Sequence, residues 1–310
     1  MDSTDESETT AEIPPAPAVE ADESPIVAKP IINGPAITLE GPDAEITGDE
    51  TDEDEDAKPD PGALIFTYIP GSGDDFGMFG FEFRGTPEPH MPEASMMAAQ
   101  PGWGITWLNG PQNNDLPPQL YHFAFTLGGQ AKVNEDLVLD LAVTPGWYTD
   151  LENRRPEAFR LMGRAAWYYR LDDITQLAVG MVYLNRDDIP ALPVAGVIFD
   201  DLEAGHRFEL VFPRPKMSWR LAESEQSSRW FTIGGELGGG SWAIKLPDRK
   251  PDVLTYRDLR LVGGLEFHGI KGRRAALEAG WLFGRAIESR TGRDDYDPPD
   301  AAMIRMVLDY

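Results

Sequence analysis

The chain has 310 residues, no cysteine and a formal net charge of -26. The lack of cysteine excludes disulfides, thiolate metal ligands and a cysteine nucleophile. The acidic excess argues against a nucleic-acid-binding protein, because such proteins neutralise phosphates with Lys and Arg, and no basic patch of the required size is visible.

The N-terminal segment, residues 1–61, is acidic and rich in Pro, Ala and Thr. Its first 60 residues hold 19 acidic and 2 basic residues, which accounts for most of the net charge. Such a composition cannot bury enough apolar surface to offset the chain entropy, so we expect a disordered tail. We interpret the acidic run Asp49–Asp56 as a solvated spacer rather than a site for a cation or a basic partner. Pro59 and Pro61 mark the boundary with a second region, residues 62–310.

The first residues of the chain lack the basic region and the apolar core of a secretory signal. No apolar run reaches the ~18–20 residues of a membrane-spanning helix. Because the features below favour an exported protein, we expect the sequence to be a mature or shortened form, or to have a wrongly assigned start.

Residues 62–310 show the alternation of apolar and polar residues that is typical of β-strands. In 121–127, for example, Tyr121, Phe123, Phe125 and Leu127 share one face. The same pattern occurs in 137–144, 160–170, 176–184, 257–268 and 274–285, and further strands are expected near 76–84, 96–108, 191–200, 206–213, 215–222, 228–245 and 301–310. No helical stripe fits these segments. The pattern predicts an all-β fold of about twelve strands, within a range of about ten to fourteen.

The connections between the expected strands fall into two classes. Short turns are expected at 132–136, 170–175 and 268–274, and longer polar loops at 149–158, 247–255 and 289–300. Short turns at one rim and long loops at the other are typical of bacterial outer-membrane barrels. We therefore expect a closed, antiparallel, up-and-down transmembrane β-barrel in the outer membrane of a Gram-negative-type bacterium, with membrane lipid as its surroundings.

The polar face of the strands combines charged side chains with glycines, which favours a crowded barrel interior over a solvent-facing sheet. We expect a network of paired charges in the lumen, formed by Arg164, Arg207, Glu209, Arg220, Glu236, Arg260, Glu266, Glu278 and Arg305. Aromatic residues cluster near strand ends, where Trp and Tyr favour a membrane interface. They are Trp103, Trp107, Tyr121, Trp147, Tyr148, Trp167, Tyr169, Tyr183, Trp230, Trp242 and Trp281.

The last strand ends at the final residue of the chain. Ile304, Met306, Leu308 and Tyr310 share one face, with Arg305 on the other. The aromatic end resembles the C-terminal assembly signal of outer-membrane barrels, which implies recognition by the barrel-assembly machinery through Tyr310, Leu308 and Met306. A terminal strand needs a partner, so we expect it to pair with the first strand and close the barrel.

A stretch near the middle of the chain carries a more specific resemblance. Residues 189–222 contain a Pro-interrupted strand, a turn of small residues and a strand that ends in a Phe-Pro pair. The spacing matches that of a known family at Pro193, Gly196, Leu210, Pro213 and Pro215. This stretch resembles an uncharacterised family of predicted outer-membrane β-barrels. The resemblance covers about a tenth of the chain in detail and implies a fold and a location, but no activity.

The sequence contains no recognisable catalytic or metal site. His90, His122, His206 and His268 lack metal-ligand spacing, and no nucleophile elbow is present. The glycine-rich stretch 234–242 does not precede a helix, so we interpret it as a strand kink or bulge rather than a phosphate-binding loop. We expect no enzyme activity, no cofactor and no metal.

Two classes of function fit these features. The first is an outer-membrane barrel that forms either a narrow channel or a largely plugged structural barrel. The second is a soluble or periplasmic, lipocalin-like barrel that binds a small apolar ligand. The paired charges favour the first class, because a lipocalin-like cup would be apolar inside. The sequence indicates neither a transported solute nor an oligomeric state.

Overall fold

The computed structural model describes residues 62–71, 75–86, 88–89, 96–110, 115–224, 226–269, 273–293 and 295–310. The expected tail, residues 1–61, lies outside these ranges, as does His90. The strands are β1 (Ala63–Ile69), β2 (Gly77–Arg84), β3 (Glu88–Pro89), β4 (Met96–Asn109), β5 (Gln119–Lys132), β6 (Leu137–Thr149), β7 (Phe159–Arg170), β8 (Thr175–Tyr183), β9 (Ala191–Asp201), β10 (His206–Phe212), β11 (Lys216–Ser224), β12 (Ser227–Lys245), β13 (Pro251–His268), β14 (Arg274–Ser289) and β15 (Ala301–Asp309). A short 3₁₀ turn, η1 (Pro156–Ala158), precedes β7. No helix in the described part of the chain is long and apolar enough to cross a membrane.

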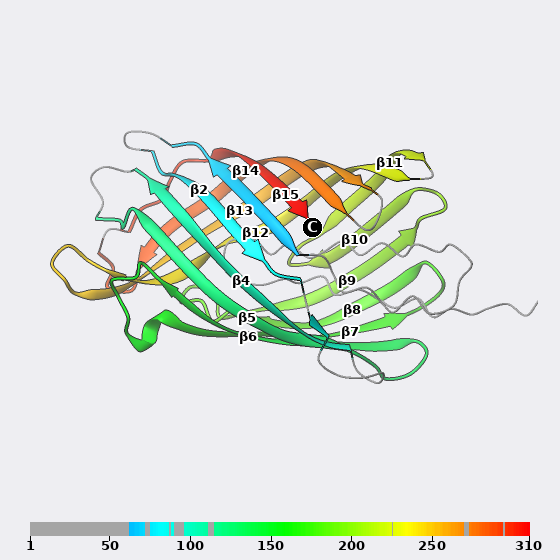
Figure 1. The fold of residues 1–310 in the computed structure, drawn as a ribbon, viewed down its shortest axis with the longest axis horizontal. Coiled ribbons are helices and arrows are strands. Elements are labelled where there is room, and N and C mark those ends of the chain that lie inside the picture. The colour runs from blue at the N-terminus through cyan, green and yellow to red at the C-terminus, as the bar shows by residue number, and fades with distance from the viewer. Residues whose placement is uncertain are drawn as a thin grey trace, which may run out of the picture.

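Fourteen of these strands, all but the short β3, form a closed antiparallel ring within the described residues (Figure 1). The last strand pairs with the first, with Ala63 opposite Asp309 and Tyr68 opposite Ile304. The additional pairing of β2 with β4 completes the circle. The expected up-and-down barrel, closed between its terminal strands, is therefore confirmed, and its fourteen strands lie at the upper end of the expected range.

The two rims of the barrel differ in their connections. The terminal rim carries both ends of the barrel region, where the backbone N–H of Tyr310 donates to the carbonyl oxygen of Gly62 at 2.9 Å. It also carries tight turns such as 133–136 and 171–174. The opposite end, called here the loop rim, carries 150–158 among its longer connections. The expected loop at 247–255 is wrong in extent, because β13 already begins at Pro251.

The strand that the sequence pattern does not reveal is β1. Its residues are apolar on both faces, so no alternation is visible. Ala63, Ile65 and Ile69 point inward and are buried, while Tyr68 points outward and is exposed. Ala63, Ile65 and Ile69 pack in apolar clusters inside the barrel, and Thr67 between them is buried as well.

The outer face of the ring is apolar around its circumference. In β5, Phe123 and Phe125 point outward and are exposed, whereas His122 points inward, stacks on Tyr148 of β6 and is buried. The most exposed large side chains include Val179, Leu261, Leu277 and Ile304 on four different strands. The alternation of the sequence thus places large apolar side chains outside and polar side chains inside.

Candidate functional site

The lumen contains a cluster of buried charges centred on Glu236 of β12. Its carboxylate accepts hydrogen bonds from Arg305 at 2.7 Å and from Arg260 at 3.2 Å, and Arg214 lies 3.7 Å away. Strand register produces this arrangement, because Glu236 lies directly opposite Arg260 on β13 and Glu278 lies opposite Arg305 on β15. Such cross-strand pairs of opposite charge stabilise a sheet.

The cluster extends along β13 through Asp258. Arg260 donates to Asp258 at 2.7 Å, the hydroxyl of Tyr256 donates to the same carboxylate at 2.5 Å, and Arg285 donates to the Tyr256 oxygen at 3.3 Å. Arg305 in turn donates to Glu278 at 2.6 Å. The central cluster comprises Arg214, Arg260, Arg305, Glu236, Asp258 and Glu278, and its charges balance.

The remaining residues of the expected charge network lie apart from this cluster. Arg207 pairs with Glu209 at 2.6 Å, and Glu266 pairs with Lys216 at 2.7 Å.

Two arginines have partners other than the expected glutamates. Arg164 on β7 donates to Asp140 on β6 at 2.5 Å, and Arg220 near the terminal rim pairs with Glu223 at 3.0 Å. The expected pairing is wrong for these two: strand register brings Asp140 into reach of Arg164, and Glu223 lies three residues after Arg220 on the same strand.

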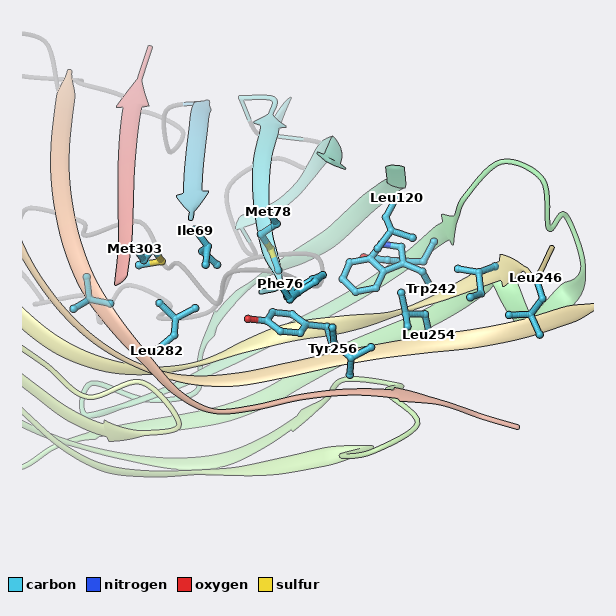
Figure 2. Packing of buried hydrophobic residues seen from close by; sticks show 14 residues of the cluster. Ile69, Phe76, Met78, Leu120, Trp242, Leu246, Leu254, Tyr256, Leu282 and Met303 are labelled. Carbon is cyan, nitrogen blue, oxygen red and sulfur yellow. The ribbon is translucent and has the colours of Figure 1, made fainter. Parts of the chain in front are cut away.

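Buried apolar side chains pack together inside the barrel near the loop rim (Figure 2). This group, called here the mouth cluster, consists of Ile69, Phe76, Met78, Leu120, Tyr148, Trp242, Ile244, Leu246, Leu254, Tyr256, Val262, Leu282, Ile287 and Met303. Trp242, Leu254 and Tyr256 of the β12–β13 hairpin point towards Phe76 and Leu120 from the opposite side. Burial of one such side chain stabilises by about 1.5–3 kcal/mol, so this packing strongly favours a closed mouth.

Three aromatic residues were expected at a membrane interface on the outer face, and this expectation is wrong. Tyr148, Trp230 and Trp242 point inward and are buried. Others of the expected set, including Trp167 and Trp281, do lie on the outer face and are exposed. Position near a strand end does not by itself decide which face an aromatic side chain occupies.

At the loop rim, β12, β13 and β14 extend beyond the strands on either side of them. Pairing of β12 with β11 ends at Gly234, whereas β12 continues to Lys245. Pairing of β14 with β15 ends at Leu282, whereas β14 continues to Ser289. Residues 239–245 of β12, 251–257 of β13 and 284–289 of β14 therefore form a three-stranded flap whose long edges pair with neither β11 nor β15. Single bridges join these edges to other parts of the chain, Ala243 to Thr149 of β6 and Ile287 to Tyr296.

All three strands are distorted where the flap leaves the wall. Gly239 of β12 has a φ of 102°, and a Cβ there would lie 1.9 Å from the carbonyl oxygen of Tyr256. The β13–β14 register shifts between Arg257 and Leu259, and Gly284 of β14 has a φ of 57°. Only glycine adopts these φ values readily. The glycine-rich stretch is thus a strand kink, as the sequence indicates.

The edge of the flap reaches β6 on the far side of the ring. Ala243 and Thr149 form a single parallel bridge. The backbone N–H of Asp150 donates to the carbonyl oxygen of Ala243 at 3.1 Å, and Asn153 donates to that of Ile244 at 2.9 Å. The flap therefore lies across the mouth and is bonded to the loop that follows β6.

A second loop, residues 184–190, holds the base of the flap. The guanidinium of Arg186 donates to the carbonyl oxygens of Gly238 at 3.1 Å and Tyr256 at 3.3 Å. Two hydrogen bonds to Asp188, at 2.7 and 3.0 Å, orient this guanidinium. Such a bidentate ion pair fixes the direction of the arginine.

Asp187 in the same loop connects the flap with the wall of β7. It accepts hydrogen bonds from Arg160 at 2.9 Å and from Arg290 at 2.7 Å. Burial alone would raise the pKa of Asp187, but the hydrogen bonds and charges of Arg160 and Arg290 hold this pKa below its ordinary value. The carboxylate therefore remains charged at neutral pH.

The inner wall opposite the charge cluster is apolar. It is formed by Val138, Ala166, Tyr168, Ala178, Val182, Val194, Ile198 and Val211, which lie on β6 to β10. Sequence analysis did not identify this wall, because the same strands also carry inward charges such as Arg164 and Arg207, from which a charged lumen was expected.

The expected assembly residues lie at the end of β15. Tyr310 is exposed, its ring stacks on Phe83 with centroids 6.2 Å apart, and its hydroxyl donates to the carbonyl oxygen of Arg84 at 3.2 Å. Met306 also faces outward, while Leu308 is half-buried.

The histidines of the described residues do not form a site. His122 is buried and stacks on Tyr148, with ring centroids 5.8 Å apart, and His268 lies 3.3 Å from Glu266. No group of three His, Asp or Glu side chains in the described part of the chain is arranged to hold a metal ion.

No protein-family model matches the chain, and no curated protein matches it. Solved structures similar to it include the NanC porin, at 7% identity over 80% of this chain and 98% of that chain, with a TM-score of 0.38. An outer-membrane channel from Pseudomonas putida F1 is 13% identical over 84% of this chain and 100% of its own, with a TM-score of 0.38. The P. putida toluene transporter TodX is 12% identical over 81% of this chain and 89% of its own, with a TM-score of 0.31. These similarities are too low to carry an argument about function.

Proposed function

We propose that the chain is an outer-membrane β-barrel that forms a narrow channel, closed at the loop rim in the conformation described. The outer face of the closed ring carries the argument. Exposed side chains such as Val179, Leu261, Leu277 and Ile304 form an apolar surface on neighbouring and distant strands alike. Soluble proteins rarely expose apolar patches of this extent, whereas a membrane barrel requires them.

The charge distribution supports a membrane barrel over the lipocalin-like alternative. A barrel that binds an apolar ligand in water needs a polar exterior and an apolar cup. This barrel has the reverse arrangement on the side of β12 to β15, where Glu236, Arg260 and Arg305 are buried inside. Charges facing lipid would cost about 2–4 kcal/mol each at mid-membrane, so their inward position suits a lipid environment.

The experiment combines folding and conductance. The chain, expressed with an added signal peptide, is expected to need detergent for solubility, to show heat-modifiable gel mobility, and to give little conductance in a planar bilayer, because the mouth cluster fills the lumen. Leu277→Arg, on the outer face, should impair insertion, whereas Asp173→Arg, in an exposed turn at the terminal rim, should not. A parent protein that is stable and monomeric without detergent would overturn the proposal.

A further inference from the structure

The flap at the loop rim has the construction of a movable element. Its strands share hydrogen bonds with one another, but β12 has no β11 partner beyond Gly234 and β14 has no β15 partner beyond Leu282. A rotation of the flap would therefore break no ladder of the barrel ring. A strand paired on both sides could not move in this way without unzipping its neighbours.

The distortions of the three strands lie on one line across the flap. Gly239 is opposite Arg257, and the register shift that follows Arg257 is opposite Gly284. Bulges and glycines at the same level allow the strands to bend together. The line that joins Gly239, Asp258 and Gly284 is thus a hinge, and the cluster around Glu236 lies immediately below it.

The contacts that hold the flap in place are of two kinds. The edge of β12 is bonded to loops by individual hydrogen bonds, from Asp150, Asn153 and Arg186. Water can replace each of these bonds, so each contributes little net stability. The inner face is held by apolar packing of Trp242 and Leu254, which resists opening.

We propose that this flap is a gate, and that its outward rotation about the line through Gly239 and Gly284 opens the lumen at the loop rim. The inference rests on the proposed function, because a gate needs a channel. In the closed position Trp242 and Tyr256 fill the mouth, and Arg186 and Thr149 hold the flap from the opposite side. Rotation removes the apolar side chains from the mouth and leaves the charged part of the lumen open to water.

The test uses the absence of native cysteine. Thr149→Cys with Ala243→Cys joins the flap to β6, since bridged residues on adjacent strands lie within the Cα separation that a disulfide needs. Trp242→Ala is added to weaken the closed position. We expect the reduced triple variant to conduct at least about tenfold more than the parent, and oxidation to abolish the increase.

The control introduces a disulfide at a site that does not move in the proposed opening. Ser224→Cys with Ser227→Cys, a register pair at the terminal rim, is combined with Trp242→Ala. Oxidation of this control should leave the raised conductance unchanged. If Trp242→Ala prevents folding, Arg186→Gln replaces it in both the test variant and the control variant, because it weakens the bonds to Gly238 and Tyr256.

Two failures are distinguishable. If the parent lacks heat-modifiable mobility and does not insert, the proposed channel itself is wrong. If the parent inserts but the oxidised triple variant conducts as well as the reduced one, the conductance comes from the volume that Trp242→Ala removes and not from motion of the flap. The proposed gate is then wrong. The gate is also wrong if neither weakening variant raises conductance.

Discussion

Replacement of Glu236 by glutamine tests how far the buried charge cluster stabilises the barrel. The side chain keeps its size and loses its negative charge. Arg214, Arg260 and Arg305 are all within 4.0 Å of the Glu236 carboxylate, so one substitution affects three ion pairs. The cluster, which is balanced in the parent, acquires a net positive charge in the variant.

The expected cost follows from the partners that remain. Removal of one member of a buried ion pair costs about 3–5 kcal/mol, because an uncompensated charge stays buried. Arg260 retains Asp258 and Arg305 retains Glu278, which reduces the loss. We therefore expect Glu236→Gln to lower the free energy of unfolding by about 3 kcal/mol, at the lower end of that range.

The measurement is urea unfolding of the protein folded in lipid vesicles, followed by tryptophan fluorescence. The matched control is Glu288→Gln, which removes the partner of Arg257 in an ion pair of 3.1 Å whose side chains are 42% and 44% exposed. An exposed pair of this kind contributes about 0–1 kcal/mol. Equal losses for the two variants would refute the reasoning, because burial of the charges would then have no consequence.

Three further expectations concern the flap and the chain end. Gly239→Ala should lower the free energy of unfolding by more than about 1 kcal/mol in the same urea assay, because the φ of Gly239 is 102° and a Cβ would meet the Tyr256 carbonyl oxygen. Gly292→Ala is the control and should cost less, because Gly292 has a φ of 69° and open space around it. A larger loss for Gly292→Ala than for Gly239→Ala would contradict the kink. The pKa of Asp187 is lowered, so the stability that its charge contributes is present at neutral pH and is lost only as pH falls below the ordinary aspartate value of about 3.9. The difference in thermal midpoint between the parent and Asp187→Asn should therefore be constant above that pH and shrink below it. A decline that begins near pH 6 would exclude Asp187 as its cause. Deletion of Tyr310 should reduce heat-modifiable folding more than its exposed position explains, if the residue acts as an assembly signal, and an unchanged folded fraction would remove that role.

The strand pattern predicted the barrel because a closed ring in lipid imposes strict alternation. Where both faces are apolar, alternation vanishes, and for this reason β1 was missed. The apolar wall of β6 to β10 was not foreseen, because charged residues on the same inward faces indicated a charged lumen. The polar residues in 247–255 indicated a loop, but β13 begins at Pro251. There the chain belongs to the flap, and residues 252–256 are buried on both faces, so they do not follow the alternation of the wall strands.

The charge cluster was predictable in its members and less so in its pairs. Alternation places Arg260 and Arg305 opposite the large apolar residues, and both are almost fully buried in the structure. The partner of Arg164 depends on register, and Asp140 enters the network only once β6 and β7 are aligned. Asp258 lies two residues before Arg260 on the same face of β13, and this pair could have been found from alternation alone. The mouth cluster was beyond prediction, since nothing in the sequence indicates that a hairpin turns inward at Gly239.

The bridge between Ala243 and Thr149 also has a consequence for the order in which the protein folds. The two strands are six places apart around the ring, although the bridge joins them directly. Contacts between such distant parts of a sheet form only after the intervening strands have curled into place, because loop closure must precede the contact. Docking of Trp242 is therefore a late event of assembly, and its fluorescence should report the completion of the barrel rather than its beginning.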